Sequence, residues 1–81
     1  MRVTVRLFAR LRDAAGVERL ELELPPEATV RHALEAVLGA RAALVPLAGV
    51  IKAAVNATHA TPDRALAEGD EVALFPPFSG G

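Results

Sequence analysis

The chain has 81 residues, of which 52% are hydrophobic and 4% aromatic, and its formal net charge is -1. This length predicts one small domain, and the nearly balanced charge excludes the basic field that attracts nucleic acid. The chain has no cysteine, which excludes disulfides, zinc–cysteine sites and a cysteine nucleophile. Its longest apolar stretch is too short to cross a membrane, and its first residues do not resemble a signal peptide. We therefore expect a cytoplasmic protein that binds neither nucleic acid nor membranes.

The first part of the chain predicts two strands separated by a short helix. Apolar and polar residues alternate from Arg2 to Leu7 and again from Arg19 to Leu24, which is the period of a half-buried strand. Residues 9–15 between them predict a helix that ends at Gly16, since glycine readily adopts the left-handed conformation after a last helical turn. Pro25-Pro26 ends the second strand, because proline cannot donate to a sheet ladder.

One amphipathic helix dominates the middle of the chain. Thr29 is a suitable N-cap, and apolar residues then recur at spacings of three and four from Val30 to Leu38. Gly39 closes this helix or lies near its end. Residues 40–49 are apolar but are interrupted by proline and glycine, so they predict an irregular connection with room for a helical turn.

Three more strands are predicted toward the end, over residues 50–56, 58–61 and 71–75. Asn56-Ala57 forms the first turn, because asparagine tolerates left-handed backbone angles. Two further turns, at residues 62–64 and 68–70, precede the last strand. The predicted order is strand, short helix, strand, main helix and three strands.

One main helix and a mixed sheet of four to five strands predict an α+β fold. Because the first and last strands both alternate, the pattern suits a β-grasp, in which the sheet wraps around the helix. The last strand then lies beside the first, parallel to it and inside the sheet. On this plan, residues 1–75 form the domain and residues 76–81 form a flexible C-terminal tail that ends in Gly80-Gly81.

Conventional catalytic groups are scarce in this sequence. His32 and His59 are the only histidines, and with no carboxylate at ligand spacing we interpret both as solvated side chains and predict no metal site. The acidic residues between Asp63 and Glu71 suit turns and a solvated rim. No glycine-rich phosphate loop is present, and Ser79 has no base near it in the sequence.

The segment after the last strand is the strongest candidate site. Pro76-Pro77 fixes two consecutive φ angles and stiffens the exit, and Phe78 is suited to anchor in a partner's pocket. Six residues can extend roughly 20 Å, enough to enter another protein's active site. We predict that a partner binds Phe75, Pro76, Pro77, Phe78, Ser79 and Gly80, and that Gly81 presents its carboxylate there.

Three basic side chains, Arg10, Arg12 and Lys52, are weaker candidates for contact with a partner. Arg10 and Arg12 lie close together on the short helix, and a plain solvated helix face explains them equally well. Lys52 is the sole lysine. It suits either a pair with a partner's carboxylate or, more simply, an exposed strand position whose stem covers apolar neighbours.

Residues 69–81, Gly-Asp-Glu-Val-Ala-Leu-Phe-Pro-Pro-Phe-Ser-Gly-Gly, resemble the C-terminus of the molybdopterin synthase small-subunit family. In that family GDEVA, an aromatic before two prolines, and a terminal Gly-Gly occur together. Residues 7–16 look like the family's first strand and short helix, and Ala54-Val55-Asn56 matches its middle turn. Phe78-Ser79 departs from the more usual small aliphatic residue and threonine.

The resemblance implies a ubiquitin-like sulfur carrier that is a non-catalytic subunit of an enzyme complex. An adenylating enzyme would consume ATP to activate the Gly81 carboxylate, and a sulfur donor would convert it into a thiocarboxylate. The large synthase subunit would then use this sulfur to form the molybdopterin dithiolene. The chain itself would bind no cofactor, and the catalytic side chains would belong to the large subunit.

Three other functions remain open at this point. Related carriers with the same fold and Gly-Gly end serve tRNA thiolation or thiamine synthesis. A protein modifier that is conjugated to lysines, as ubiquitin is, would have the same end. A plain β-grasp interaction domain with an inert tail would explain the pattern without any chemistry.

Overall fold

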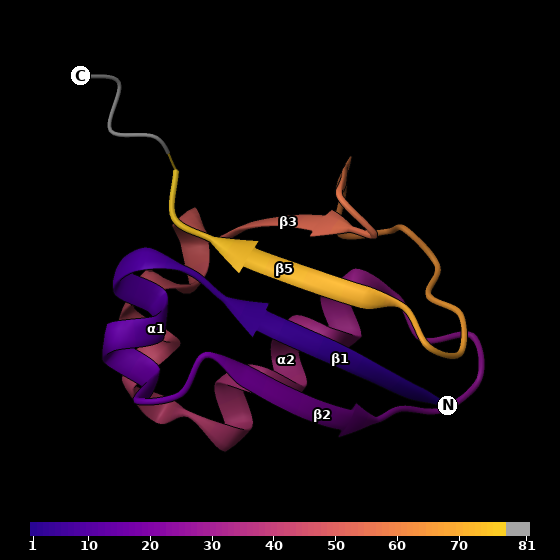
Figure 1. Ribbon diagram of the computed structural model, residues 1–81, viewed down its shortest axis with the longest axis horizontal. Coiled ribbons are helices and arrows are strands. Elements are labelled where there is room, and N and C mark those ends of the chain that lie inside the picture. Colours follow the sequence, from indigo (N-terminus) through magenta and orange to yellow (C-terminus); the bar gives the residue numbers. More distant parts are fainter. Residues whose placement is uncertain (78–81) are drawn as a thin grey trace.

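The computed structural model describes residues 1–77, and its elements follow the predicted order (Figure 1). The main helix and the first and last strands lie where the sequence predicts them. In chain order the elements are β1 (Arg2–Leu7), α1 (Ala9–Ala15), β2 (Arg19–Glu23), α2 (Val30–Ala40), the 3-10 helix η1 (Ala42–Val50), β3 (Lys52–Val55), β4 (Thr58–Ala60) and β5 (Glu71–Phe75).

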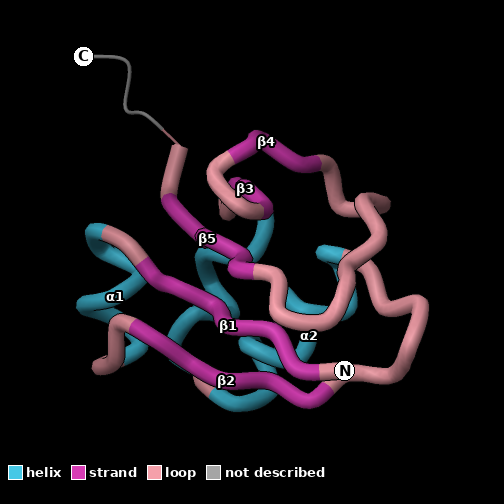
Figure 2. The backbone as a smooth tube through the Cα atoms, turned by 45° about the vertical axis from the view of Figure 1, so that its right-hand side comes forward, coloured by secondary structure: helices cyan, strands magenta, loops and turns pink. Residues whose placement is uncertain are grey.

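The strands form one mixed five-stranded sheet in the order β2-β1-β5-β3-β4. β5 lies in the middle, parallel to β1 with Val5 opposite Val72, and antiparallel to β3 with Val55 opposite Val72. β2 and the short β4 are the two edge strands, and α2 lies behind the sheet in the view of Figure 1 (Figures 1 and 2). This topology confirms the predicted α+β arrangement with the last strand beside the first.

The core lies between the sheet and its helices. The inward positions of the strands alternate with exposed or half-buried ones, as the sequence predicts. Burial of a valine or leucine side chain stabilises a fold by about 1.5–3 kcal/mol, so these side chains supply most of the driving force. The fully buried large side chains are Leu7, Leu11, Leu44, Leu74, Val3, Val5, Val37, Val55 and Val72.

Residues 40–49 differ from the prediction, because the expected irregular connection is the 3-10 helix Ala42–Val50. α2 also continues past Gly39 to Ala40, and the third strand begins at Lys52, after the predicted residue 50. The apolar run has no helical periodicity that a sequence pattern would detect. Its conformation follows from packing, since Leu44 is fully buried and η1 lies against both α1 and α2.

The start of α2 depends on a side chain that the sequence analysis interpreted as merely solvated. Thr29 is the N-cap, as predicted, and its N–H donates to His32 Nδ1 at 2.9 Å. Backbone N–H groups of the next two residues, Val30 and Arg31, donate at 2.9 Å to the carbonyls of Arg64 and Pro62. The free N–H groups of the first helical turn are therefore satisfied by His32 and by the loop before β5.

The turn between β3 and β4 is tied to the start of β5. Asn56 and Ala57 have φ angles of 48° and 71°, as in the two-residue hairpin turns that favour Asn-Gly. The Asn56 side chain accepts a hydrogen bond from Glu71 N–H at 2.9 Å and donates one to Asp70 Oδ1 at 2.9 Å. Asp70 Oδ2 in turn accepts from Ala67 N–H at 2.8 Å, so one network fixes both turns.

Replacing Ala57 by glycine is expected to stabilise the fold by about 0.5 kcal/mol. An L-residue in the left-handed region costs roughly 1–2 kcal/mol, and glycine removes this cost while adding a smaller entropy to the unfolded chain. Urea unfolding of Ala57→Gly and of the parent chain measures the difference. Equal or lower stability of Ala57→Gly would mean that Ala57 is not strained.

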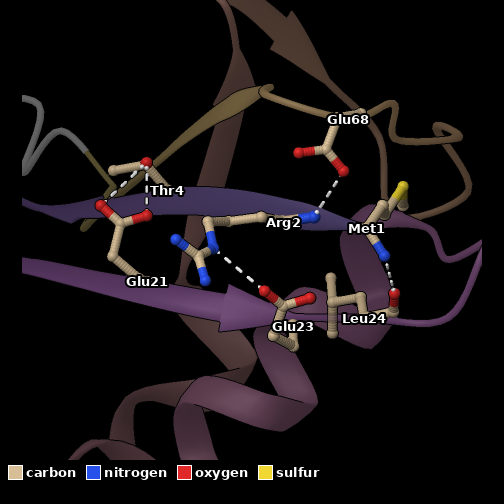
Figure 3. Close-up of polar contacts among 7 residues, drawn as sticks. All are labelled: Met1, Arg2, Thr4, Glu21, Glu23, Leu24 and Glu68. Carbon is tan, nitrogen blue, oxygen red and sulfur yellow. Dashed lines mark hydrogen bonds and ion pairs between the residues drawn. The ribbon is translucent and has the colours of Figure 1, made fainter.

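Hydrogen bonds and an ion pair hold the start of β1 in place (Figure 3). The Met1 ammonium donates to the Leu24 carbonyl at 2.5 Å, and Arg2 Nε donates to Glu23 Oε1 at 3.0 Å. The hydrogen bond and the charge of Glu23 raise the pKa of the Arg2 guanidinium above its ordinary value. Arg2 N–H also donates to Glu68 Oε1 at 2.9 Å. These contacts lie at the opposite end of the parallel β1–β5 pair from the point where β5 ends.

Candidate partner-binding site

The candidate site surrounds the end of the central strand β5. Phe75 is its last residue, and Phe75, Pro76 and Pro77 are all half-buried. Because β5 is hydrogen-bonded on both sides by β1 and β3, this end of the chain leaves a firmly held strand. The other residues predicted to belong to the site, Phe78, Ser79, Gly80 and Gly81, lie outside the described residues.

Phe8 brings a second aromatic ring to this end of the sheet. Its N–H donates to the Leu74 carbonyl at 3.1 Å, which continues the parallel register in which Leu7 lies opposite Leu74. Phe8 follows Leu7, and Phe75 follows its partner Leu74. Phe8 and Phe75 are therefore at equivalent positions at the ends of two neighbouring parallel strands. Its side chain stays 37% exposed. The following residue, Ala9, has a φ angle of 51°, a left-handed conformation at the sharp change from β1 into α1.

Arg6 supports the Phe8 ring from the outer face of the sheet. Its guanidinium carbon lies 5.2 Å from the centre of the ring, within the range of a cation–π interaction. Arg6 Nη1 also lies 3.8 Å from Glu71 Oε1, but this pair is exposed and contributes little. The ring contact contributes on the order of 0.5–1 kcal/mol. Arg6 thus orients Phe8 more than it stabilises the fold.

The outer face of the sheet beside the two rings carries small apolar side chains, and a lysine lies at its border. Ala73 lies opposite Ala54 of β3, and both are half-buried. Lys52, at the start of β3, is the Cα partner of Phe75 and is exposed. We refer below to the exit surface, which consists of Arg6, Phe8, Lys52, Phe75, Pro76 and Pro77.

Arg10 and Arg12 are placed differently from each other. Both are exposed on α1, as predicted. Arg10 lies two residues after Phe8, in the first turn of α1. Arg12 lies toward the other end of the helix, where its Nε is 3.9 Å from Asp13 Oδ1 and it borders a shallow depression with Val17 and Arg19.

The polar side chains of residues 1–77 lie at the surface of the domain. This part of the chain contains no buried polar or charged residue and no cluster of His, Asp and Glu that would hold a metal ion. The same residues contain no helix long and apolar enough to cross a membrane.

The sequence analysis missed Phe8 and Arg6 as members of this site. Both follow from the alternation along β1, since Arg2, Thr4, Arg6 and then Phe8 fall on one side of the strand while Val3, Val5 and Leu7 are buried. The parallel pairing with β5 then places Phe8 near Phe75. The pairing of Lys52 with Phe75 had no local signal, because it depends on the β3–β5 register.

A family model and a curated relative both match almost the whole chain. The model of the ThiS family matches residues 5–81. A molybdopterin synthase sulfur carrier subunit from Chlamydomonas reinhardtii is 36% identical over 83 residues, which cover 100% of both chains.

Two solved structures extend the comparison. The crystal structure of SAMP1 from Haloferax volcanii, whose fuller name is small archaeal modifier protein 1, superposes with a TM-score of 0.88, 36% identity and 100% coverage of both chains. A complex of subunits 1 and 2 of molybdopterin-converting factor from Helicobacter pylori contains a chain that matches with a TM-score of 0.69 and 28% identity, again over 100% of each chain. These neighbours include both a carrier and a modifier.

Proposed function

The chain belongs to the ThiS family of ubiquitin-like β-grasp proteins, and from this premise we propose that it is the sulfur carrier subunit of molybdopterin synthase. The observation that carries the proposal is the exit surface. Two aromatic rings, Phe8 and Phe75, flank the place where a central strand leads into Pro76-Pro77 and on toward Gly80-Gly81. A partly exposed surface with two aromatic rings at the base of a glycine-ended segment suits a protein that presents its end to partners.

Gly81 is the residue that reacts in this proposal. Its carboxylate oxygen attacks the α-phosphorus of ATP on an adenylating enzyme, pyrophosphate leaves, and an acyl-adenylate forms. Hydrosulfide released by a sulfur donor then attacks the carbonyl carbon, and the bond to AMP breaks with AMP taking the electron pair. Loss of the S–H proton leaves a thiocarboxylate on Gly81. Glycine at both terminal positions lets the backbone enter a narrow active site, since no Cβ meets the walls.

The large subunit of the synthase is the proposed partner for the second half of the cycle. It would bind the exit surface, take sulfur from the thiocarboxylate and supply the catalytic side chains for dithiolene formation. The Helicobacter pylori complex of subunits 1 and 2 supports this partner. ATP would be consumed on the adenylating enzyme, no cofactor would stay on this chain, and we place these reactions in the cytoplasm.

Intact mass spectrometry tests the proposal. The chain, a cognate adenylating enzyme, ATP and a sulfur donor should give a mass increase that equals one oxygen-to-sulfur exchange. Adding the large subunit and its pterin substrate should return the chain to its original mass. An unchanged mass with an adenylating enzyme that demonstrably hydrolyses ATP in response to the chain would contradict the proposal.

A protein modifier is the second candidate, and the likeness to SAMP1 is the observation that favours it. In this case the activated Gly81 would be transferred to lysine amines of other proteins. Digestion of proteins recovered from the native cell would then give lysines linked to the Gly-Gly end. The two functions share the activation step, so the product after activation distinguishes them.

Phe8→Ala is expected to weaken binding of the large subunit by about tenfold, which corresponds to about 1.4 kcal/mol. The loss follows because the ring is exposed, lies at the exit surface and is oriented by Arg6. Titration calorimetry of the complex measures the dissociation constant.

Val45→Ala is the matched control for this measurement. Val45 is also an exposed apolar residue, 54% accessible, but it lies on η1 instead of the exit surface. We expect Val45→Ala to bind like the parent chain. Equal affinity of Phe8→Ala and the parent chain, with both folded, would remove Phe8 from the interface.

A further inference from the structure

We propose that Arg6 and Arg19 together form a recognition site for an acidic side chain of the protein that docks at the exit surface. Under the proposed function, on which this inference rests, that protein is the large synthase subunit. The site extends the exit surface from β1 to the edge strand β2. It gives a role to Arg19, which the proposed function leaves without one.

Arg6 and Arg19 are two like charges placed directly opposite each other in the β1–β2 ladder. They are Cα partners in an antiparallel pair, and both side chains are exposed. They lie on the outer face of the sheet, because Val5, the residue before Arg6, is buried on the inner face. Side chains opposite each other in such a ladder have Cβ atoms about 4.5–5.5 Å apart, and like charges there are destabilising. The pair therefore weakens the fold unless another group compensates the two charges.

The other outward pairs of the same ladder are complementary (Figure 3). Arg2 Nε donates to Glu23 Oε1 at 3.0 Å, and the Thr4 hydroxyl donates to Glu21 Oε2 at 2.9 Å. Donors and acceptors are thus matched along the outer face of β1 and β2, except at the end where β1 leads into Phe8. The mismatch lies beside the exit surface.

Within residues 1–77, no carboxylate is placed to neutralise this pair of arginines. Arg6 Nη1 lies 3.8 Å from Glu71 Oε1, which is a long and exposed contact. The direct neighbour of Arg6 on β5 is Ala73, which carries no charge. Arg19 forms no ion pair with any residue of this range, and β2 has no strand on its other side.

The depression beside α1 is a less suitable site for an acidic group. Arg12 and Arg19 border it, but so do Asp13 and Glu18. Its charges are therefore balanced, whereas the outer face at Arg6 and Arg19 carries two cations side by side.

The guanidinium of Arg6 is held in a position that suits a carboxylate. Its central carbon lies 5.2 Å from the centre of the Phe8 ring. A guanidinium stacked on a ring keeps its edge N–H groups available, and these donors match the two oxygens of a carboxylate. A carboxylate between Arg6 and Arg19 accepts hydrogen bonds from both and removes their repulsion.

An acidic side chain of a docked protein fits this site better than a free anion does. The Arg6 side chain is 44% exposed, and exposed charges in water are screened and attract an anion only weakly. A protein that covers the adjoining Phe8 ring also removes water from the guanidinium groups, which strengthens a charge-assisted hydrogen bond. Since Arg6 belongs to the exit surface, one partner covers both features.

Titration calorimetry of the large subunit with variants of Arg19 tests the inference. Arg19→Gln removes one of the two charges, and we expect binding about tenfold weaker than that of the parent chain. Arg19→Glu places a carboxylate opposite Arg6, where it pairs with that guanidinium and repels the partner's acid. We expect binding about 100-fold weaker for this variant. Both losses should shrink at high salt, because salt screens the interaction.

Thermal unfolding supplies the second measurement. Because Arg19→Gln removes a repulsion, its melting temperature should equal or exceed that of the parent chain, and that of Arg19→Glu should be higher still. Weaker binding by a chain that is no less stable separates recognition from a structural role.

Arg64→Gln is the matched control for the loss of one positive charge. Arg64 is exposed in the loop before β5, and its carbonyl accepts from Val30 N–H at the start of α2. This loop lies at the opposite end of β5 from Phe75 (Figure 1). We expect Arg64→Gln to bind the large subunit like the parent chain.

Three outcomes would overturn the inference and leave the proposed function in place. These are parent-like affinity of both Arg19 variants, equal losses in Arg19→Gln and Arg64→Gln, and a melting temperature of Arg19→Gln clearly below that of the parent chain. Saturable binding of inorganic phosphate that Arg19→Gln abolishes, at constant ionic strength, would assign the pair to a free anion instead. A parent chain that does not bind the large subunit would contradict the proposed function itself, and the acidic partner with it.

Discussion

A chain that lacks Gly81 is expected to lose the ATP-dependent oxygen-to-sulfur exchange completely. The deletion moves the terminal carboxylate back by one residue, about 3.3–3.6 Å of extended chain, while the exit surface, the proposed docking surface, stays in place. A displacement of about 1 Å from the reacting position already costs on the order of 100-fold in rate. Intact mass after incubation with the adenylating enzyme, ATP and sulfur donor measures the loss.

Val45→Ala, at an exposed position of η1 outside the exit surface, is the control for this deletion. It leaves the terminal segment and both glycines unchanged, so we expect exchange at the parent rate. Normal stability of both variants in urea would show that the domain is intact. Exchange on the shortened chain at a rate comparable with Val45→Ala would contradict the proposal that Gly81 is the reacting residue.

Asn56→Ala is expected to destabilise the domain by about 2–3 kcal/mol. The substitution removes the acceptor of Glu71 N–H and the donor to Asp70, and it places alanine at a φ angle of 48°. Each hydrogen bond contributes about 0.5–1.5 kcal/mol, and an unsatisfied partner adds to the loss. For a domain of this size, the melting temperature should fall by roughly 10 °C or more.

Thr58→Ala is the matched control for Asn56→Ala. Thr58 is exposed in β4 two residues along the same hairpin and has no side-chain hydrogen bond among the described residues. A change within ±0.5 kcal/mol is expected for it. If Asn56→Ala unfolds at the same urea concentration as Thr58→Ala, the network around Asp70 does not hold the two turns together.

The role of Asn56 changes the meaning of two motifs in the sequence. Ala54-Val55-Asn56 and the Gly-Asp-Glu-Val segment that starts at Gly69 are two separate motifs in the sequence. In the structure they form one unit, since Asn56 bonds to Asp70 and to the backbone of Glu71. The unit sets the start of β5 and therefore its register against β1 and β3. These motifs position the exit surface without belonging to it.

Much of the fold was predictable because its signals are local. Alternation along β1 and β5, proline after β2, Thr29 before α2 and Gly16 after α1 each report on a few neighbouring residues. For residues 40–49 the sequence predicted an irregular connection with room for a helical turn, and the structure has a 3-10 helix over most of this stretch. Its full extent had no periodic signature, because it follows from the burial of Leu44 against two helices. His32 is exposed, as predicted. Its hydrogen bond from Thr29 N–H had no sequence signal, because it depends on the position of that N–H at a formed helix start.

The amino-acid sequence alone was enough to predict the α+β class and the parallel placement of the last strand, which the structure confirms. It also predicts Gly80-Gly81 as the reactive end, and this stays a prediction. These depend on the order and period of residues along the chain. Only the tertiary structure decided which groups surround the end of β5. Phe8, Arg6 and Lys52 are distant from Phe75 in the sequence, and they meet it because hydrogen bonding between strands sets one register for the whole sheet.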